Sequence, residues 1–305
     1  MTIPAGSDAV VTLQTGEDKL AAMRGLMGAA MFAESLRGAL ALGKASGQAA
    51  RFSVAIKVFV DYTAGENQVD FSTDPDLVDL LTDEIGSVGS FGSVGSLGSA
   101  GVSSITVLVD RLEGAERYVA RLKKVNYTVA SMADQPEPYD LESFAGETPI
   151  GKAWLDADFR ISFGKVRTSR PYFYEATITN VGLGLAGPVT EGRRHANGLR
   201  PERFEEDVLL VDRLPVHFGF ADAWLSADGP RGRRLKSTRT LLAAEQLLAV
   251  DWVVGEKMGL DPALNPVIQE AMYRWGTLHL IRQGNTTPWA GWKNVSTMTV
   301  VWNNL

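Results

Sequence analysis

The sequence contains no cysteine, and only three of its 305 residues are histidines. Without cysteine there is no disulfide bond, no thiolate zinc site, no cysteine nucleophile and no iron–sulfur cluster ligated by this chain. A histidine-rich metal cage is also excluded unless carboxylates complete it. Covalent chemistry must therefore use another kind of side chain, and we expect no metal site built from protein ligands.

Long uncharged hydrophobic runs are missing as well. The most apolar early stretch, residues 20–43, is interrupted by Arg24, Glu34 and Arg37, so it predicts a buried helix rather than a membrane span. The first residues lack the basic start and apolar core of an export signal. We therefore expect a cytoplasmic protein that makes no membrane contact.

Basic residues are missing from one long segment. Between Lys57 and Arg111 there is no lysine or arginine, whereas nine aspartates and glutamates fall there, and the net charge of the chain is −6. This balance argues against a nucleic-acid partner, because binding to a phosphate backbone needs many uncompensated cations. By contrast, residues 231–239 ("RGRRLKSTR") carry five basic residues and no carboxylate, which favours a small anion as the ligand there.

What is present is a repeating pattern of buried strands and amphipathic helices. Strands are predicted at 8–14, 51–62, 103–110, 154–166, 216–225 and 239–245, and helices at 18–43, 73–86, 114–125, 248–259 and 267–276. Residues 176–200 are predicted to form a long loop. Alternating strands and helices imply parallel strand pairing with right-handed crossovers. We expect one α/β domain with a mostly parallel, twisted sheet and helices on both faces, or two lobes, 1–145 and 146–305, around a cleft.

The clearest helix start is "STDPDLVDLL". Thr73 or Asp74 can cap the helix, Pro75 suits its first turn, and Asp76 adds favourable negative charge near its N-terminus. We expect the helix to end at Gly86.

Glycine recurs at every third position in "GSVGSFGSVGSLGSAG", residues 86–101. A phosphate-binding loop needs a strand before it and a helix after it, whereas this run follows a predicted helix and precedes a predicted strand. It also contains no lysine. The composition favours a Gly/Ser-rich connector, and an anion-binding nest of backbone amides is the alternative.

Six segments follow one another along the chain: "VAIKVFV", "STDPDLVDLL", "LDADFRISFGKVRTS", "ATITNVGLGLAGP", "HFGFADAWLSADGPRG" and "LLAVDWVVGEKMGLDP". In this order they resemble the motifs of the family of unknown function called DUF362. The resemblance covers roughly residues 50–285 and is most specific in the C-terminal half. It implies an α/β fold. It does not imply an activity, because functions vary among proteins of one fold.

The chain also departs from that family. Arg167, Thr168 and Ser169 stand where members often have Lys-Thr-His, and Thr179 and Asn180 stand where they have Lys-Asn. Many members carry ferredoxin-like cysteines, which this chain lacks, so the resemblance implies no redox cofactor for it. The chain looks like a divergent, cysteine-free member.

Two lysines in strands are the first candidate catalytic residues. Lys57 sits in an otherwise apolar strand, where an unpaired ammonium is costly to desolvate, so it must reach solvent, a carboxylate or a ligand. Lys165 ends a strand at the edge where open α/β sheets bind ligands. Each could act as a base or as an anion clamp, and the alternative for Lys165 is a solvated strand end.

Three further residues are candidates for catalysis. His195 lies in a segment without apolar patterning, so packing does not explain it. Asp222 stands at the end of the run "HFGFAD", within the strand predicted at 216–225, and Asp251 lies inside the apolar helix "LLAVDWVV". A carboxylate in such surroundings needs a partner, so it should pair with a cation or cap a nearby loop.

Four residues are predicted to bind the substrate. Arg231 and Arg233 follow a strand expected at the cleft, and arginine suits carboxylate or phosphate recognition. Arg167 and Asn180 occupy the positions where the DUF362 family has polar residues.

Together these features predict an enzyme that acts on a small anionic metabolite without a redox cofactor, with lyase, isomerase or transferase chemistry fitting equally well. The alternative is a non-catalytic ligand-binding or assembly protein that retains the DUF362-like fold. In that case the tryptophan-rich C-terminal residues could form homo-oligomer contacts, since tryptophan is enriched at interfaces.

Overall fold

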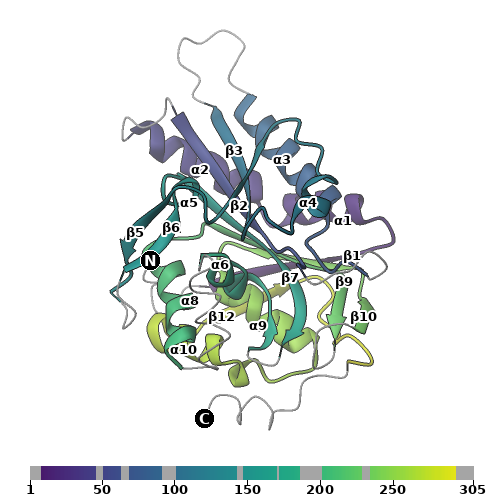
Figure 1. The fold of residues 1–305 in the computed structure, drawn as a ribbon. Helices are drawn as coiled ribbons and strands as arrows, with labels where there is room; N and C mark the ends of the chain where they lie inside the picture. The colour runs from purple at the N-terminus through teal and green to yellow at the C-terminus, as the bar shows by residue number, and fades with distance from the viewer. Residues whose placement is uncertain are drawn as a thin grey trace.

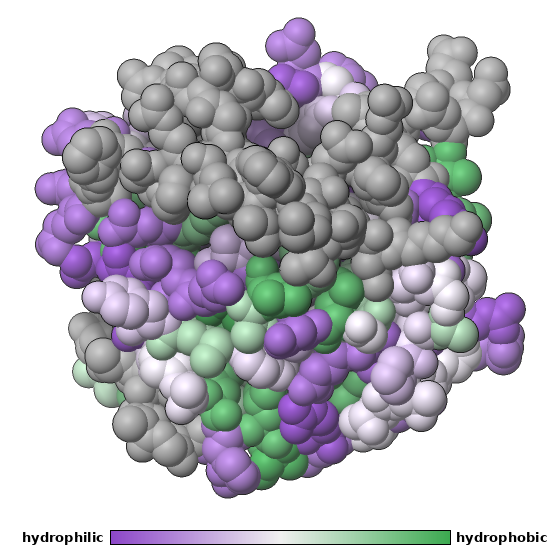
Figure 2. All heavy atoms as spheres, turned by 90° about the horizontal axis from the view of Figure 1, so that it is seen from below, coloured by the Kyte–Doolittle hydropathy of each residue, from purple (hydrophilic) through white to green (hydrophobic). Residues whose placement is uncertain are grey.

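A single ten-stranded sheet runs through the molecule, with helices on both of its faces (Figure 1). The computed structural model describes residues 8–45, 51–62, 69–90, 101–142, 147–169, 172–185, 201–228 and 234–292. Seen from below, the visible face carries hydrophobic side chains in areas separated by hydrophilic ones (Figure 2). None of the helices in these ranges has the length and apolar content needed to cross a bilayer.

The strand order is β12-β1-β11-β9-β7-β2-β3-β4, with β10 paired to β9 and β8 paired to β7. The central strands β9, β7, β2, β3 and β4 are parallel, and β11 is antiparallel to both of its neighbours. The predicted α/β fold with a mostly parallel sheet is confirmed. The strands are β1 (Asp8–Thr15), β2 (Phe52–Val58), β3 (Val102–Val109), β4 (Thr128–Ser131), β7 (Phe159–Ser169), β8 (Phe173–Glu175), β9 (Phe218–Asp228), β10 (Arg234–Ser237), β11 (Thr240–Ala244) and β12 (His279–Gln283).

The helices form one layer on each face of the sheet (Figure 1). On one face lie α1 (Lys19–Ala29), α2 (Phe32–Ala45), α3 (Pro75–Ser90) and α4 (Glu116–Val119). On the other lie α5 (Lys152–Leu155), α6 (Thr177–Leu185), α8 (Pro201–Arg213), α9 (Leu247–Lys257) and α10 (Pro266–Trp275). A short 3-10 helix, η2 (Pro262–Leu264), and a hairpin of β5 (Pro136–Asp140) and β6 (Glu147–Gly151) complete the described elements.

Each layer of helices has its own hydrophobic core. Successive residues of a central strand point to opposite faces of the sheet. Side chains such as Ile56 and Phe163 belong to the core beneath α1–α4, whereas Ala55, next to Ile56 in β2, belongs to the core beneath α6–α10. Strands covered on both faces read as continuous apolar runs, which is why β2 could be predicted as a central strand. Strands from both halves of the chain belong to this one sheet, because β2 pairs with β7 and β1 with β11.

Several predicted elements differ from the structure, among them the helix expected at 114–125, of which α4 covers only Glu116–Val119. The helix expected at 18–43 is two helices, broken where Met31 adopts a φ of 54°. The helix at 73–86 does not end at Gly86 but continues to Ser90. Most of the predicted glycine-run connector, residues 91–100, lies outside the described residues. Part of the loop expected at 176–200 is the helix α6, and residues 186–200 also lie outside the described ranges.

Candidate functional site

Charged side chains gather where the central parallel strands end. Lys57 lies at the end of β2, Lys165 toward the end of β7, and Asp222 in β9 directly opposite Lys165 in the strand register. Ligands of open α/β sheets bind beyond this carboxyl edge. The sheet topology therefore brings together residues that are up to 165 positions apart in the sequence.

Lys165 and Asp222 form a fully buried ion pair. The Nζ–Oδ2 distance is 2.8 Å, and the side chains are 3% and 0% exposed. Oδ2 also accepts a hydrogen bond from the backbone N–H of Asp74 at 3.0 Å, and Oδ1 accepts one from the N–H of Trp224 at 3.0 Å. The carboxylate of Asp222 is thus saturated with donors, which compensates the cost of its desolvation. Lys165 is not the solvated strand-end residue that the sequence left open.

The beginning of α3 is tied to this pair. The side chain of Asp74, one of the two caps that the sequence allowed, accepts from the N–H of Asp76 at 3.0 Å, and Lys19 binds both carboxylates. The backbone C=O of Asp74 accepts from Leu77 and Val78. The first amides of α3 are therefore used inside the protein, and Asp222 takes the position at this helix N-terminus that a bound anion would otherwise occupy.

Lys57 has its own carboxylate partner. Its Nζ lies 2.6 Å from Oδ1 of Asp110, which follows β3, and donates to the C=O of Val58 at 2.7 Å. Lys57 is buried, whereas the side chain of Asp110 is 24% exposed. The sequence allowed Lys57 to reach solvent, a carboxylate or a ligand, and in the structure it reaches the carboxylate of Asp110.

The two lysines point to opposite faces of the sheet. Side chains alternate between faces along a strand. Lys57 has the parity of Ala55, which belongs to the α6–α10 core, whereas Lys165 has the parity of Phe163, which belongs to the α1–α4 core. The two amines therefore do not converge in one crevice.

Asn180 and Arg167 also lie near the carboxyl edge. The Nδ2 of Asn180, in α6, donates to the C=O of Lys57 at 2.9 Å and to Oγ of Ser162 at 3.0 Å. Arg167 pairs with Glu175 at 2.6 Å and stacks over the ring of Phe59, with its Cζ 4.4 Å from the ring centroid. Both predicted substrate-binding residues thus already have protein partners.

Asp251 caps a helix instead of pairing with a cation. One oxygen accepts from the N–H and hydroxyl of Thr177, and the other from the N–H of Ile178 at 3.0 Å, at the start of α6. Of the two partners that the sequence allowed, the cap is the one found. Burial raises the pKa of Asp251 to about 6, although the hydrogen bonds from Thr177 and Ile178 oppose the shift. Asp251 therefore holds the start of α6 in place, and with it Asn180, which lies in that helix.

The histidines lie apart from this edge, as far as the structure describes them. His217 precedes β9, stacks on Phe159, and accepts a hydrogen bond from the N–H of Arg160 at 3.0 Å. Burial lowers its pKa to about 4, and the charge of Arg160 adds to the shift. His279 is exposed in β12 and pairs with Asp8. The predicted residues His195, Arg231 and Arg233 lie outside the described residues, and their roles remain predictions.

Sequence reasoning missed two partners at this edge. Asp110 directly follows the apolar strand β3, so the signal of a charge beside an apolar run could have identified it. Glu175 is buried beside Arg167, but nothing in its local sequence distinguishes it from a surface residue. Within the described ranges, no three histidine, aspartate or glutamate side chains gather closely enough to hold a metal ion.

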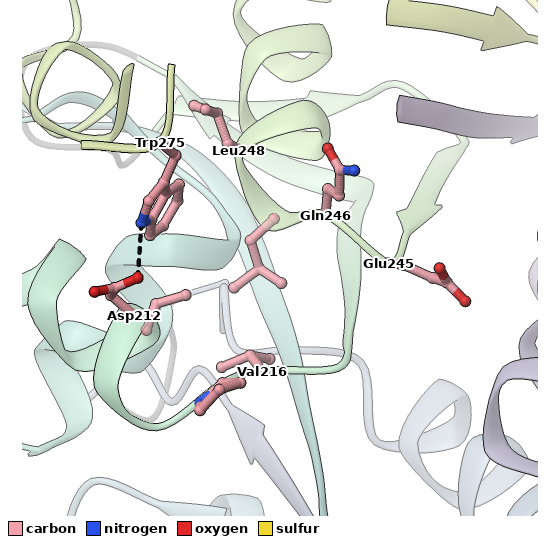
Figure 3. A pocket seen from close by; sticks show the side chains of 9 residues that line it. Asp212, Val216, Glu245, Gln246, Leu248 and Trp275 are labelled. Atoms are coloured by element: carbon pink, nitrogen blue, oxygen red, sulfur yellow. Dashed lines mark hydrogen bonds between the residues drawn. The ribbon is translucent and has the colours of Figure 1, made fainter. Parts of the chain in front are cut away.

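Two hollows lie away from the carboxyl edge. A cavity of about 40 Å³ opens at the start of α9, where Trp275 donates to Asp212 at 3.2 Å (Figure 3). It has room for a few water molecules but not for a metabolite. A larger hollow of about 510 Å³ lies between α9, α10 and β12, with Trp252, Met272 and Leu280 in its wall. We place the candidate site at the buried charges, because the ion pair in the wall of the larger hollow, Glu256 with Arg282, is about one-third exposed.

The chain matches no known protein-family profile and no curated protein. Among solved structures it is similar to the lactate racemase apoprotein from Thermoanaerobacterium thermosaccharolyticum, with a TM-score of 0.43 and 12% sequence identity. The similarity covers 80% of this chain and 56% of that one, so this chain spans little more than half the length of its structural neighbour. No functional argument follows from a similarity of this size.

Proposed function

We propose that the protein is an enzyme that acts on a small anionic metabolite without a redox cofactor, at the carboxyl edge of β7 and β9. Lys165 binds the anionic group, and Asp222 orients Lys165. We also propose, from the motifs between residues 50 and 285, that the chain is a divergent member of the DUF362 family.

The observation that carries this proposal is the buried pair of Lys165 and Asp222. A buried ion pair is weak evidence for stability, because apolar residues of similar volume often stabilise a fold equally well. A buried pair at the ligand-binding edge of an open sheet therefore suggests a chemical role. The ammonium of Lys165 has three N–H donors, and in the part of the chain described here only Asp222 accepts from it. Two donors are left for a ligand.

The same geometry suits more than one reaction. An ammonium held by a carboxylate stabilises negative charge that develops on a substrate oxygen, and this serves lyase, isomerase and transferase chemistry alike. Lys57 and Asp110 form a second pair on the other face. We propose them as a proton-transfer or charge-stabilising pair that is separate from the anion clamp.

A specific observation favours the alternative of a binding or assembly protein. Lys57, Lys165 and Arg167 each already have a carboxylate partner. Neutralised cations can hold a ligand through their remaining donors without catalysing a reaction on it. Such a protein would bind the same class of anion without turnover, either as a monomer or as a homo-oligomer.

A thermal-shift screen tests the proposal. The wild-type protein is heated with phosphosugars, nucleotides and small carboxylates, and a ligand that binds only the folded state raises Tm. Lys165→Met should abolish the shift for the ligand found. Lys257→Met is the matched control, because Lys257 is equally buried but donates to the C=O groups of Asn285 and Thr287.

The outcomes separate the alternatives. A Tm shift that is lost in Lys165→Met and kept in Lys257→Met, together with turnover of the ligand, supports the enzyme. The same shifts without turnover support the binding protein. If Lys165→Met does not fold, Lys165→Arg replaces it, since arginine keeps the charge but changes the donor geometry. A silent screen contradicts a metabolite site.

A further inference from the structure

Tyr118 in α4 has a buried hydroxyl group to which the described part of the chain offers no partner. The residue is 2% exposed, and among the described residues no atom forms a hydrogen bond with its hydroxyl. An unpaired polar group in a protein interior weakens the fold, so buried hydroxyls nearly always have a partner. A polar group of a ligand bound at this position would supply such a partner.

Contacts with α3 hold Tyr118 close to the candidate site. One turn after Tyr118, Arg121 pairs at 2.6 Å with Asp70, which lies shortly before α3. The N–H of Lys123 donates to Asp79 of α3 at 3.2 Å. These contacts fix α4 against the first turns of α3, where Asp222 also binds, and Figure 1 shows α4 beside that end of α3.

The electrostatic surroundings agree with this position. Burial raises the pKa of Tyr118 well above its ordinary value, and the negative charges of Asp70, Asp222 and Asp74 raise it further, as does Tyr127. The phenol therefore keeps its proton and acts as a hydrogen-bond donor. Tyr118 also belongs to the hydrophobic core on the α1–α4 face of the sheet, the face to which Lys165 points.

Around Tyr118 and Lys165 the described residues offer too few hydrogen-bond acceptors for the donors present. Asp222 receives donors from Lys165, Asp74 and Trp224, so both of its oxygens are engaged. The described residues offer no acceptor to the O–H of Tyr118 and none to two of the N–H groups of Lys165. A group rich in oxygen acceptors would satisfy all of these donors.

We propose that Tyr118 and Lys165 together bind one oxyanion of the ligand, the oxygens of a phosphate or a carboxylate group. This inference rests on the proposed function and adds a residue to the same site. Tyr118 donates its hydroxyl hydrogen to the oxyanion, Lys165 supplies the charge, and Asp222 keeps the lysine in position. The ligand enters on the α1–α4 face of the sheet, not on the face of Lys57.

Removal of one hydroxyl group tests the inference without the ligand. In Tyr118→Phe the unpaired hydroxyl is gone, so Tm should stay equal to that of the wild type or rise. The matched control is Tyr127→Phe. The hydroxyl of Tyr127 donates to Asp79 at 2.5 Å, so its loss leaves a buried carboxylate short of a donor, and Tm should fall.

The second measurement is affinity. Thermal-shift titrations with inorganic phosphate and with acetate give the apparent Kd for each anion and show which oxyanion is preferred. A hydrogen bond to a charged group implies that Tyr118→Phe weakens binding by on the order of tenfold or more. Tyr127→Phe should bind the preferred anion as the wild type does.

Each contrary result has a distinct meaning. If Tyr118→Phe lowers Tm as much as Tyr127→Phe does, the hydroxyl is already bonded within the protein and the inference is wrong. If Lys165→Met abolishes binding but Tyr118→Phe leaves Kd unchanged, or if the ligand found has no oxyanion, the inference fails while a metabolite site at Lys165 stands. If no ligand binds the wild type, both the inference and the proposed function fail.

Discussion

The ammonium of Lys165 lies 2.8 Å from the carboxylate of Asp222, which occupies the register position opposite it on the adjacent parallel strand. Because the two residues are register partners, the sheet brings their side chains to neighbouring positions on the same face. Asp222 also accepts a hydrogen bond from the backbone N–H of Asp74, the residue just before α3. One carboxylate therefore couples two strands and a helix at the edge where we place the ligand.

Breaking this pair should destabilise the protein strongly. Lys165→Met leaves Asp222 buried without a counter-charge, which should lower the free energy of unfolding by about 3–5 kcal/mol. The double variant Lys165→Met/Asp222→Asn should lose less than the sum of the two single variants, because neither charge is then left alone. Urea unfolding of the four proteins measures this coupling.

The exposed pair of Lys19 and Asp76 is the control for that cycle. Lys19 is 29% exposed and its partners Asp74 and Asp76 are 16% and 51% exposed, so solvent screens both pairs and Lys19→Ala should cost only about 1 kcal/mol. Equal losses for Lys19→Ala and Lys165→Met would mean that Lys165 is solvated, in contradiction to the structure.

Asp251 makes stability depend on pH. Its pKa is about 6 in the folded protein against an ordinary value of 3.8, so between these values the folded state binds a proton that the unfolded state has released. Stability is therefore highest below pH 4 for this group and falls by about 3 kcal/mol as the pH rises to 6. Asp251→Asn should remove that fall from a series of urea unfolding curves. An identical profile in wild type and variant would contradict the assignment.

His217 should act in the opposite direction over an overlapping range. Its pKa is about 4 in the folded protein against an ordinary value of 6.5. The unfolded state takes up a proton first as the pH falls, so stability is full above pH 6.5 and decreases toward pH 4, by roughly 2–3 kcal/mol. His217→Asn keeps an acceptor for the N–H of Arg160 and should remove this acid-side loss. In NMR spectra, the ring signals of His217 should titrate near pH 4, and a midpoint near 6.5 would contradict burial.

Much of this site could be recognised in the sequence, because a charge in an apolar run is a local signal. Lys57, Asp222 and Asp251 stood out in this way, Lys165 stood out by its place at a strand end, and all four are buried. Their partners were harder to predict. The pairing of Lys57 with Asp110 depends on strand register, and the hydroxyl of Tyr118 shows its lack of a partner only in three dimensions.

The helix α6 shows why part of the fold was missed. Its sequence, "TITNVGLGL", combines β-branched residues with glycines and has a weak helix propensity. The helix begins where Asp251, 74 positions away, accepts its first amides, and it packs closely on β7. Long-range packing therefore overrides local preference, and a local sequence pattern cannot reveal it.

The close approach of α6 to β7 requires Gly164. A Cβ at this position would lie 2.0 Å from the C=O of Ala176 and 3.2 Å from the Cβ of Asn180, so Gly164→Ala must push α6 away from the strand. We expect a loss of about 3 kcal/mol or more in urea unfolding, since the obstacle is backbone. The control is Gly38→Ala in α2, where a Cβ meets no atom within 4 Å, and there alanine should stabilise the helix by about 0.5–1 kcal/mol. If Gly164→Ala were as stable as Gly38→Ala, α6 would not lie against β7. The position of Asn180 beside Lys57 would then lose its support as well.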